Sequence, residues 1–323
     1  MLRQTRRSVS EVMRGGERMQ DLVFALRRLA ERNRDGSFKT QYDRKHMLML
    51  MGEQLVALGY KQLQPGEIKG RHVQKLLQRW QEEGISAGTQ SNRLAVLRWW
   101  CEKVGRSSVM AKSNAVYGIG QRERVSEESK GKRLEEGMLA QVGDAHVRMS
   151  LRMIEAFGLR RKESLLVRVH EADKGEYLAL QASWTKGGLA RQIPITMLPE
   201  QRDVVEAVKA FVPYRTSSLI PENMTYIRQR HKFDFWVQKI GLGGAHGLRH
   251  SWAQRRYLQL TQFLCPHAGG PLWEDMTDEQ RARDTEARSI LSREMGHFRA
   301  EITQTYIGKK RRSEESASEL SSG

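Results

Sequence analysis

Six side chains in the second half of the sequence have the chemical types that breaking a phosphodiester bond requires. They are two arginines, two histidines, one lysine and one tyrosine: Arg160, Lys186, His246, Arg249, His297 and Tyr306. Negative charge builds on the non-bridging oxygens during such a reaction, and arginine suits it because its planar guanidinium donates two parallel hydrogen bonds. Tyrosine could act as the nucleophile, while histidine and lysine could transfer protons. Each residue alone has an ordinary structural explanation, but together they cover every task of a metal-free cleavage.

Short motifs surround these residues. Gly158–Glu163 reads Gly-Leu-Arg-Arg-Lys-Glu, and His246–His250 reads His-Gly-Leu-Arg-His at the predicted start of a helix. Met295–His297 reads Met-Gly-His and is followed nine residues after its histidine by Tyr306. Lys186 falls on a Gly-rich turn between two predicted strands.

The order of these residues and their motifs resemble those of the tyrosine recombinase (phage integrase) family. The catalytic domain of that family carries Arg, Lys, His-x-x-Arg, His and Tyr in this order along the chain. The resemblance covers roughly residues 134–310 and, more weakly, the helical N-terminal region. It implies a fold that is mainly α with a small antiparallel β-sheet. A helical core-binding (SAM-like) domain would precede an α+β catalytic domain.

The resemblance implies a site-specific DNA recombinase, an integrase that inserts or excises a mobile element of the phage or genomic-island type. Tyr306 would attack the scissile phosphate and form a 3′-phosphotyrosyl link, releasing a 5′-hydroxyl. Arg160 and Arg249 would bind the phosphate oxygens, Lys186 would protonate the leaving oxygen, and His246 would act as acid and base.

Three further residues have supporting roles in this interpretation. His297 would donate a hydrogen bond to the phosphate, Glu163 would hold an active-site side chain in place, and His250 would be mainly structural. No metal or other cofactor is required, because the covalent link conserves the phosphodiester energy. The implied partners are double-stranded DNA with specific attachment sites, a homotetramer in the synaptic complex, and an accessory DNA-bending or directionality factor.

The elements that must position these residues follow from apolar periodicity. The predicted domains are a helical DNA-binding domain (1–105), a basic linker (106–133), a catalytic domain (134–312) and a flexible tail (313–323). Strands are predicted at 165–169, 177–180 and 192–195, and catalytic-domain helices at 142–157, 199–211, 224–240, 246–260, 277–292 and 302–306.

A strong basic surplus points to a polyanionic partner. Lys+Arg number 55 against 38 Asp+Glu, a formal net charge of +17, and basic side chains bind phosphates by releasing condensed counterions. The candidate DNA-binding residues lie beside the helical stripes of the first domain and in the linker: Arg71, Lys75, Arg79, Arg93, Arg98, Arg122 and Arg124.

Composition narrows the class of protein. The two cysteines, Cys101 and Cys265, are far apart, which argues against a disulfide framework and a four-cysteine zinc site. No apolar run is long enough for a membrane span, and the first twenty residues lack a signal-peptide core. We therefore expect a soluble bacterial cytoplasmic protein that associates with the nucleoid when it binds DNA.

One segment departs from the compact members of the family. The stretch between Arg249 and His297 is long, and the excess falls at 261–283, which contains Cys265 and His267. A surface loop is favoured there over a metal site, since two scattered ligands are too few. After the tyrosine, Ile307 and its neighbours are expected to contact a partner protomer.

Three other functions remain open from the residues alone. A type IB topoisomerase uses nearly the same chemistry, although His246 and the helical N-terminal region favour a recombinase. A silent DNA-binding regulator is disfavoured by the intact set of six, and a metal-dependent nuclease by the absence of a carboxylate/histidine cluster. His246 and His250 could form an H-x-x-x-H metal pair, but Gly247 stands where a zinc peptidase carries its glutamate.

Overall fold

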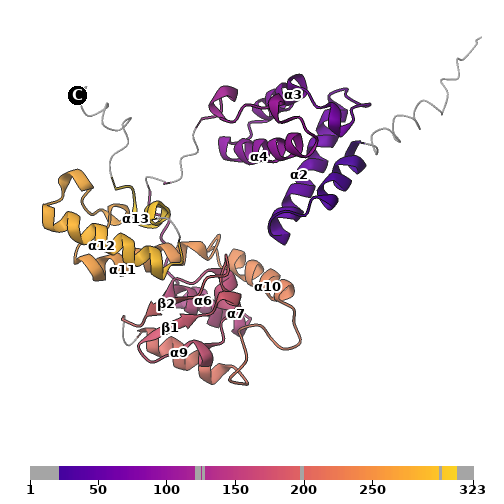
Figure 1. The fold of residues 1–323 in the computed structure, drawn as a ribbon. Coiled ribbons are helices and arrows are strands. Elements are labelled where there is room, and N and C mark those ends of the chain that lie inside the picture. The colour runs from indigo at the N-terminus through magenta and orange to yellow at the C-terminus, as the bar shows by residue number, and fades with distance from the viewer. Residues whose placement is uncertain (1–21, 121–124, 126–127, 197–199, 298–299, 311–323) are drawn as a thin grey trace, which may run out of the picture. The chain divides into compact units, whose positions relative to one another are not determined.

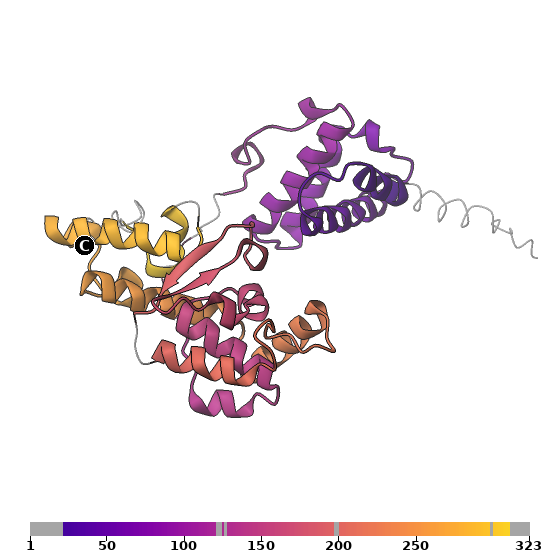
Figure 2. The same cartoon turned by 60° about the horizontal axis from the view of Figure 1, so that its bottom comes forward.

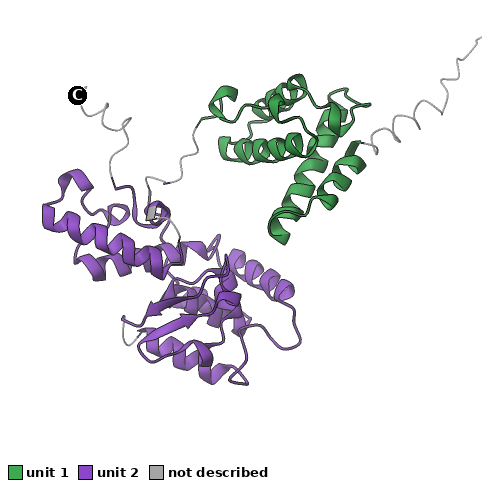
Figure 3. Ribbon diagram, viewed as in Figure 1, with its two compact units in different colours: residues 1–123 green, residues 124–323 purple. Residues whose placement is uncertain are grey.

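The computed structural model describes residues 22–120, 125, 128–196, 200–297 and 300–310. The chain divides into two compact units, Met1–Glu123 and Arg124–Gly323 (Figure 1, Figure 3). Each unit has its own hydrophobic core. The predicted residues Arg122 and Arg124 and the predicted tail at 313–323 lie outside the described residues.

The first unit is a helical bundle. Residues 22–32 form a helix, followed by α2 (Phe38–Ala57), α3 (Gly70–Glu82) and α4 (Ala87–Lys103), with 3-10 turns at Pro65–Glu67, Ser107–Val109 and Ala115–Tyr117. Serine side chains begin two of the helices: Ser37 accepts from the Thr40 amide and Ser86 from the Thr89 amide. The core is completed by Trp80, whose indole N–H donates to the buried Gln54 at 2.9 Å.

The segment predicted as a linker, 106–133, is folded at both ends. Met110 and Ile119 are buried in the core of the first unit. At the other end, the Lys132 amide donates to the Gly247 carbonyl at 3.0 Å within the second unit. The connection between the two units is therefore shorter than the segment 106–133 that the composition suggested.

The second unit contains most of the helices and the only sheet among the described residues. Its helices are α5 (Glu136–Gln141), α6 (Ala145–Phe157), α7 (Arg161–Leu166), α8 (Val169–Ala172), α9 (Glu200–Phe211), α10 (Tyr226–Lys239), α11 (His246–Thr261), α12 (Asp278–Glu294) and α13 (Gln304–Ile307). Short 3-10 turns lie at Ala182–Trp184, Pro266–Ala268, Trp273–Asp275 and Ala300–Thr303.

The sheet is a two-stranded antiparallel hairpin of β1 (Tyr177–Leu180) and β2 (Arg191–Pro194). Its register pairs Leu178 with Ile193 and Leu180 with Arg191. Figure 2 shows it as a narrow ribbon beside the helices of the second unit. Together with the helices this confirms the prediction of a mainly α fold with a small antiparallel sheet.

The predicted strand at 165–169 is wrong. These residues end α7 and begin α8 instead. Leu165, Val167 and Val169 are all buried, so their alternation resembles a strand. Helix α7 nevertheless forms because the Glu163 carboxylate accepts the Arg160 amide at 2.7 Å and closes the first turn.

A glycine directs the chain from α6 into the segment that carries Arg160. Gly158 ends α6 with φ of +59°, a left-handed conformation that favours glycine. A Cβ added at this position would lie 2.4 Å from Cε3 of Trp252 on α11. The tight approach of α6 to α11 thus depends on the absence of a side chain at residue 158.

Candidate active site

Tyr306 lies within a cluster of three histidines and an arginine. It sits on the single turn of α13, is 5% exposed, and its hydroxyl is 3.2 Å from Nε2 of His246. Its ring centroid lies 4.5 Å from that of His250 and 5.2 Å from that of His297, which is stacked on it. The cluster is built from α11 and from the segments after α12.

Helix α11 supplies one wall of the site because three of its residues project from its first turns. His246 begins the helix, and Arg249 and His250 follow at i+3 and i+4, the spacing that places side chains on one helix face. The His246 and His250 rings lie 5.2 Å apart. The motif His-x-x-Arg-His therefore presents all of its functional side chains toward Tyr306.

Arg249 is only 1% exposed, and two backbone carbonyls hold its side chain in place. It donates through Nη1 to Gly158 and through Nη2 to Met295, the latter at 2.6 Å. Its Nη2 also lies 3.4 Å from Nε2 of His297, and its Cζ lies 5.5 Å from the Tyr306 ring centroid. Burial lowers the pKa of Arg249 to about 10, so the guanidinium stays charged at neutral pH.

Arg160 is held by Glu163 and by a backbone carbonyl. Arg160 Nη1 donates to Glu163 Oε1 at 2.8 Å, and Nη2 donates to the Gly296 carbonyl at 3.1 Å. Arg191 on β2, which belongs to none of the sequence motifs, donates two further hydrogen bonds to the same carboxylate. Burial alone would raise the pKa of Glu163, but Arg191, Arg160 and Arg249 outweigh it and lower the pKa to about 2.

The histidines of the site are neutral at pH 7. Burial, together with neighbouring positive charges, lowers the pKa of His250 to about 4 and that of His297 to about 3. The pKa of His246 is also lowered, by desolvation of its ring and by Arg249 and Arg160, although the residue remains exposed and solvent tempers the shift. A neutral His246 with an unprotonated Nε2 can accept the proton of the Tyr306 hydroxyl.

Two family models match this chain. The model described as phage integrase, N-terminal, matches residues 19–110, and the model described as integrase matches residues 119–255. The chain belongs to the tyrosine recombinase (phage integrase) family. The second match ends before His297 and Tyr306, so these two residues are joined to the family motif by the geometry above.

Solved tyrosine recombinase structures share the fold. The Tn1549 transposon integrase in complex with circular intermediate DNA is 15% identical, with 92% of this chain and 99% of that chain covered and a TM-score of 0.54. A lambda integrase dimer bound to a COC' core site is 13% identical, with 96% of this chain and 83% of that chain covered and a TM-score of 0.57. The XerH recombinase bound to difH is 13% identical, with 99% of this chain and 91% of that chain covered and a TM-score of 0.54. No curated protein sequence matches the chain.

Lys186 stands apart from the other five residues of the recombinase motif. It lies on the turn that joins β1 to β2, as predicted, but its side chain is exposed and makes no hydrogen bond or ion pair with the described residues. The structure therefore brings Arg160, His246, Arg249, His297 and Tyr306 together and leaves Lys186 outside the cluster.

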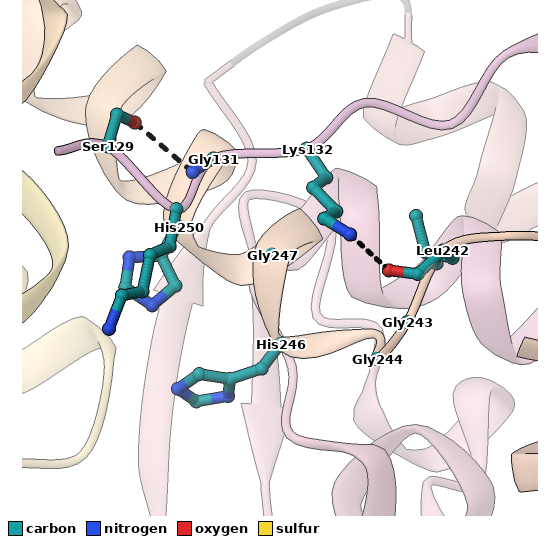
Figure 4. A pocket seen from close by; sticks show the side chains of 10 residues that line it. Ser129, Gly131, Lys132, Leu242, Gly243, Gly244, His246, Gly247 and His250 are labelled. Atoms are coloured by element: carbon teal, nitrogen blue, oxygen red, sulfur yellow. Dashed lines mark hydrogen bonds between the residues drawn. The ribbon is translucent and has the colours of Figure 1, made fainter. Parts of the chain in front are cut away.

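A pocket of about 470 Å³ opens beside the site (Figure 4). It is lined by the segments 129–132 and 242–244 and by His246, Gly247 and His250. Lys132 closes one side by donating through Nζ to the Leu242 carbonyl at 2.6 Å. Two of the histidines around Tyr306, His246 and His250, thus also face an open, partly polar space.

The segment at 261–283, predicted as a surface loop, is exposed at many positions but is anchored to the core of the second unit. Cys265 is fully buried in the core of the second unit, and His267 donates through Nδ1 to the Tyr306 carbonyl at 3.2 Å. Ile307, which was expected to contact a partner protomer, is fully buried in the same core. In the described part of the chain, no three His, Cys, Asp or Glu side chains are grouped to hold a metal.

The basic residues predicted on the first unit differ in their surroundings. Arg71 and Lys75 are exposed on α3, whereas Arg79 forms an ion pair with Glu83 at 2.6 Å. Arg93 lies 5.1 Å from the Trp80 ring, and Arg98 donates to the Ala111 carbonyl and to Asn114.

None of the helices in the described part of the chain combines the length and apolar character that a membrane crossing requires.

Proposed function

We propose that this tyrosine recombinase cleaves and rejoins DNA at specific sites through a covalent link to Tyr306, and that it integrates or excises a mobile element. The observation that carries the proposal is the 3.2 Å approach of the Tyr306 hydroxyl to His246, beside the guanidinium of Arg249. A nucleophile, a proton acceptor and a phosphate-binding cation thus meet in one place.

In the proposed step, the Tyr306 oxygen attacks phosphorus while its proton passes to Nε2 of His246. The bond from phosphorus to the 5′-oxygen breaks, and Lys186 protonates that oxygen after its hairpin turn moves onto the DNA. The reverse step has a 5′-hydroxyl attack the phosphotyrosine and release the tyrosine. The phosphodiester energy is conserved, so the reaction requires no nucleotide.

The two arginines stabilise the charge that grows on the phosphate. Arg249 and Arg160 each carry five N–H donors, and their bonds to carbonyls and to Glu163 use only some of these. Arg249 Nε is buried without a partner among the described residues. The same bonds that leave donors available also fix the direction of each guanidinium before the phosphate arrives.

Double-stranded DNA with attachment sites, and a homotetramer around two duplexes, are the proposed partners. The DNA-bound Tn1549, XerH and lambda integrase structures, among them a lambda integrase tetramer on a Holliday junction, support this by analogy of fold. In this proposal the recombination takes place in the bacterial cytoplasm, with the assistance of an accessory DNA-bending or directionality factor.

Covalent trapping tests the proposal. Purified protein in EDTA is incubated with nicked duplexes carrying candidate attachment sites and resolved on a denaturing gel. We expect a slowly migrating adduct that is absent for Tyr306→Phe and retained for Tyr214→Phe, whose tyrosine is exposed and remote in sequence. DNA binding without any adduct would instead indicate a silent regulator, and adducts spread evenly over the DNA would indicate topoisomerase-like relaxation.

A further inference from the structure

The residues between α11 and α12 lie against the segment that carries the nucleophile. The 3-10 turn Pro266–Ala268 packs on α13. The Trp273 amide donates to the Lys310 carbonyl at 3.1 Å, and the Lys310 ammonium lies 3.5 Å from the Trp273 ring centroid. We call residues 265–273 the clasp.

The clasp contacts the segment that carries Tyr306 at every second residue, at positions 306, 308 and 310. At residue 306 the backbone carbonyl accepts His267 Nδ1 at 3.2 Å and Gln254 of α11 at 3.1 Å. At residue 308 a Cβ would lie 2.8 Å from Cβ of Pro266 and 3.0 Å from the His267 amide nitrogen, so the glycine permits a close backbone approach. At residue 310 the contacts to Trp273 complete the series.

The clasp is itself anchored to the body of the second unit. Cys265 is fully buried in the core. The Gly270 amide donates to the Cys265 carbonyl at 2.9 Å, and a Cβ at Gly270 would lie 1.7 Å from the Leu264 carbonyl oxygen, so this part of the chain is tightly coiled. Arg281 of α12 donates to the Trp273 carbonyl at 3.1 Å. Because both ends are held, the clasp can fix another segment.

We propose that the clasp positions Tyr306, with His267 as the positioning residue, and keeps the tyrosine in the active site of its own chain. The proposal rests on the proposed function of Tyr306 as nucleophile. Helix α13 is a single turn and cannot hold its side chain in place by helix formation alone. A carbonyl oxygen can only accept, so Nδ1 of His267 carries the proton in this hydrogen bond.

The test uses a matched pair of substitutions at His267. In His267→Asn the side-chain amide nitrogen is as many bonds from the backbone as Nδ1 and can donate the same hydrogen bond. His267→Leu has a similar branched shape but donates nothing. Leu264→Ala, at a residue that is 45% exposed next to the clasp, is the control.

Two measurements are made on the full-length protein. Hydrogen exchange by mass spectrometry follows the backbone of 304–310 and does not depend on activity. Single-turnover adduct formation on the nicked duplex follows the chemistry, with DNA affinity measured in parallel. We expect His267→Leu to accelerate the exchange and slow adduct formation, each by about tenfold, with DNA affinity unchanged.

In His267→Asn we expect both the exchange rate of residues 304–310 and the rate of adduct formation to return toward the wild-type values. Leu264→Ala should behave like the wild-type protein in both measurements. Unchanged exchange in His267→Leu, an unchanged cleavage rate, or failure of His267→Asn to recover would each overturn the positioning role. If the wild-type protein forms no adduct, the proposed function fails, while hydrogen exchange still decides whether His267 fixes the Tyr306 segment.

Discussion

Arg191 donates two parallel hydrogen bonds to Glu163, from Nη1 to Oε1 at 3.0 Å and from Nη2 to Oε2 at 2.7 Å. Arg191 comes from the hairpin and Glu163 from α7, and the same carboxylate holds Arg160. A third Arg191 hydrogen bond goes to the Glu294 carbonyl at the end of α12. The Arg191–Glu163 ion pair therefore connects the hairpin, α7 and α12 next to the guanidinium of Arg160.

Removing Arg191 should be costly because Glu163 is fully buried. We expect Arg191→Met to lower the free energy of unfolding by about 3–5 kcal/mol and to slow DNA cleavage, since a buried carboxylate loses its main partner. Urea denaturation would measure the loss. The double variant Arg191→Met/Glu163→Gln removes the buried charge as well and should recover part of the stability; an equal loss in both variants would contradict this account.

Stability should fall as the pH drops from about 6.5 to about 4. His250 is 2% exposed, and burial lowers its pKa from the ordinary value of about 6.5 to about 4 in the folded chain. Between these values only the unfolded chain binds the proton, so the unfolded state gains stability at lower pH by about 1.4 kcal/mol per pH unit for this group. Urea denaturation at several pH values would test this, and His250→Gln should flatten the slope; parallel slopes would refute it.

Substitution of Gly158 should damage both the fold and the chemistry. Gly158→Ala places Cβ 2.4 Å from Trp252 and disturbs the carbonyl that Arg249 contacts. Gly175→Ala is the matched control, because Gly175 has φ of +84° but nothing within 4 Å of its Cβ. We expect a loss of about 1–2 kcal/mol from backbone strain in both variants and a further loss of about 1–3 kcal/mol only at Gly158. Thermal unfolding would show equal losses if the contact with Trp252 were unimportant.

The two kinds of basic residue on the first unit should behave differently in DNA binding. Lys75 is exposed, and we expect Lys75→Ala to weaken binding at all sequences and to reduce the slope of log affinity against log salt by about 1. Arg98 makes hydrogen bonds within its own unit. Arg98→Ala should therefore reduce stability and leave the salt slope unchanged. The reverse pattern in salt titrations would place Arg98, not Lys75, on the DNA.

The grouping of the candidate site residues could be predicted in part from the sequence because their spacing has a local basis. His246, Arg249 and His250 lie on one face of a single helix, and Glu163 follows Arg160 within one helical turn. Arg191 and His267 were not selected because their roles depend on tertiary contacts between distant segments. The only local signal at Arg191 was a charged residue at the start of a strand, which is common on exposed edges.

Local patterns also explain the errors. The alternation of buried residues at 165, 167 and 169 favoured a strand, but the hydrogen bond from the Arg160 amide to Glu163 began a helix there. Arginine is a rare residue at this position, so no capping motif was recognised. The clasp was taken for a loop because Cys265 and His267 were too few for a metal site, and Gly269-Gly270-Pro271 within it is a turn signal. That signal predicts a change of chain direction and says nothing about which segment the turn then contacts.

The carbonyl bonds of Arg249 also bear on how such a gene can lose its activity over evolutionary time. Arg249 joins the end of α6 to the end of α12 through Gly158 and Met295, so a chain that no longer cut DNA would still need it to fold. Lys186 is not needed for folding in the same way, because its side chain is exposed and makes no hydrogen bond or ion pair with the described residues. In a lineage freed from selection for cleavage, we expect the lysine to drift first and the buried arginine to persist as a relic of the lost reaction.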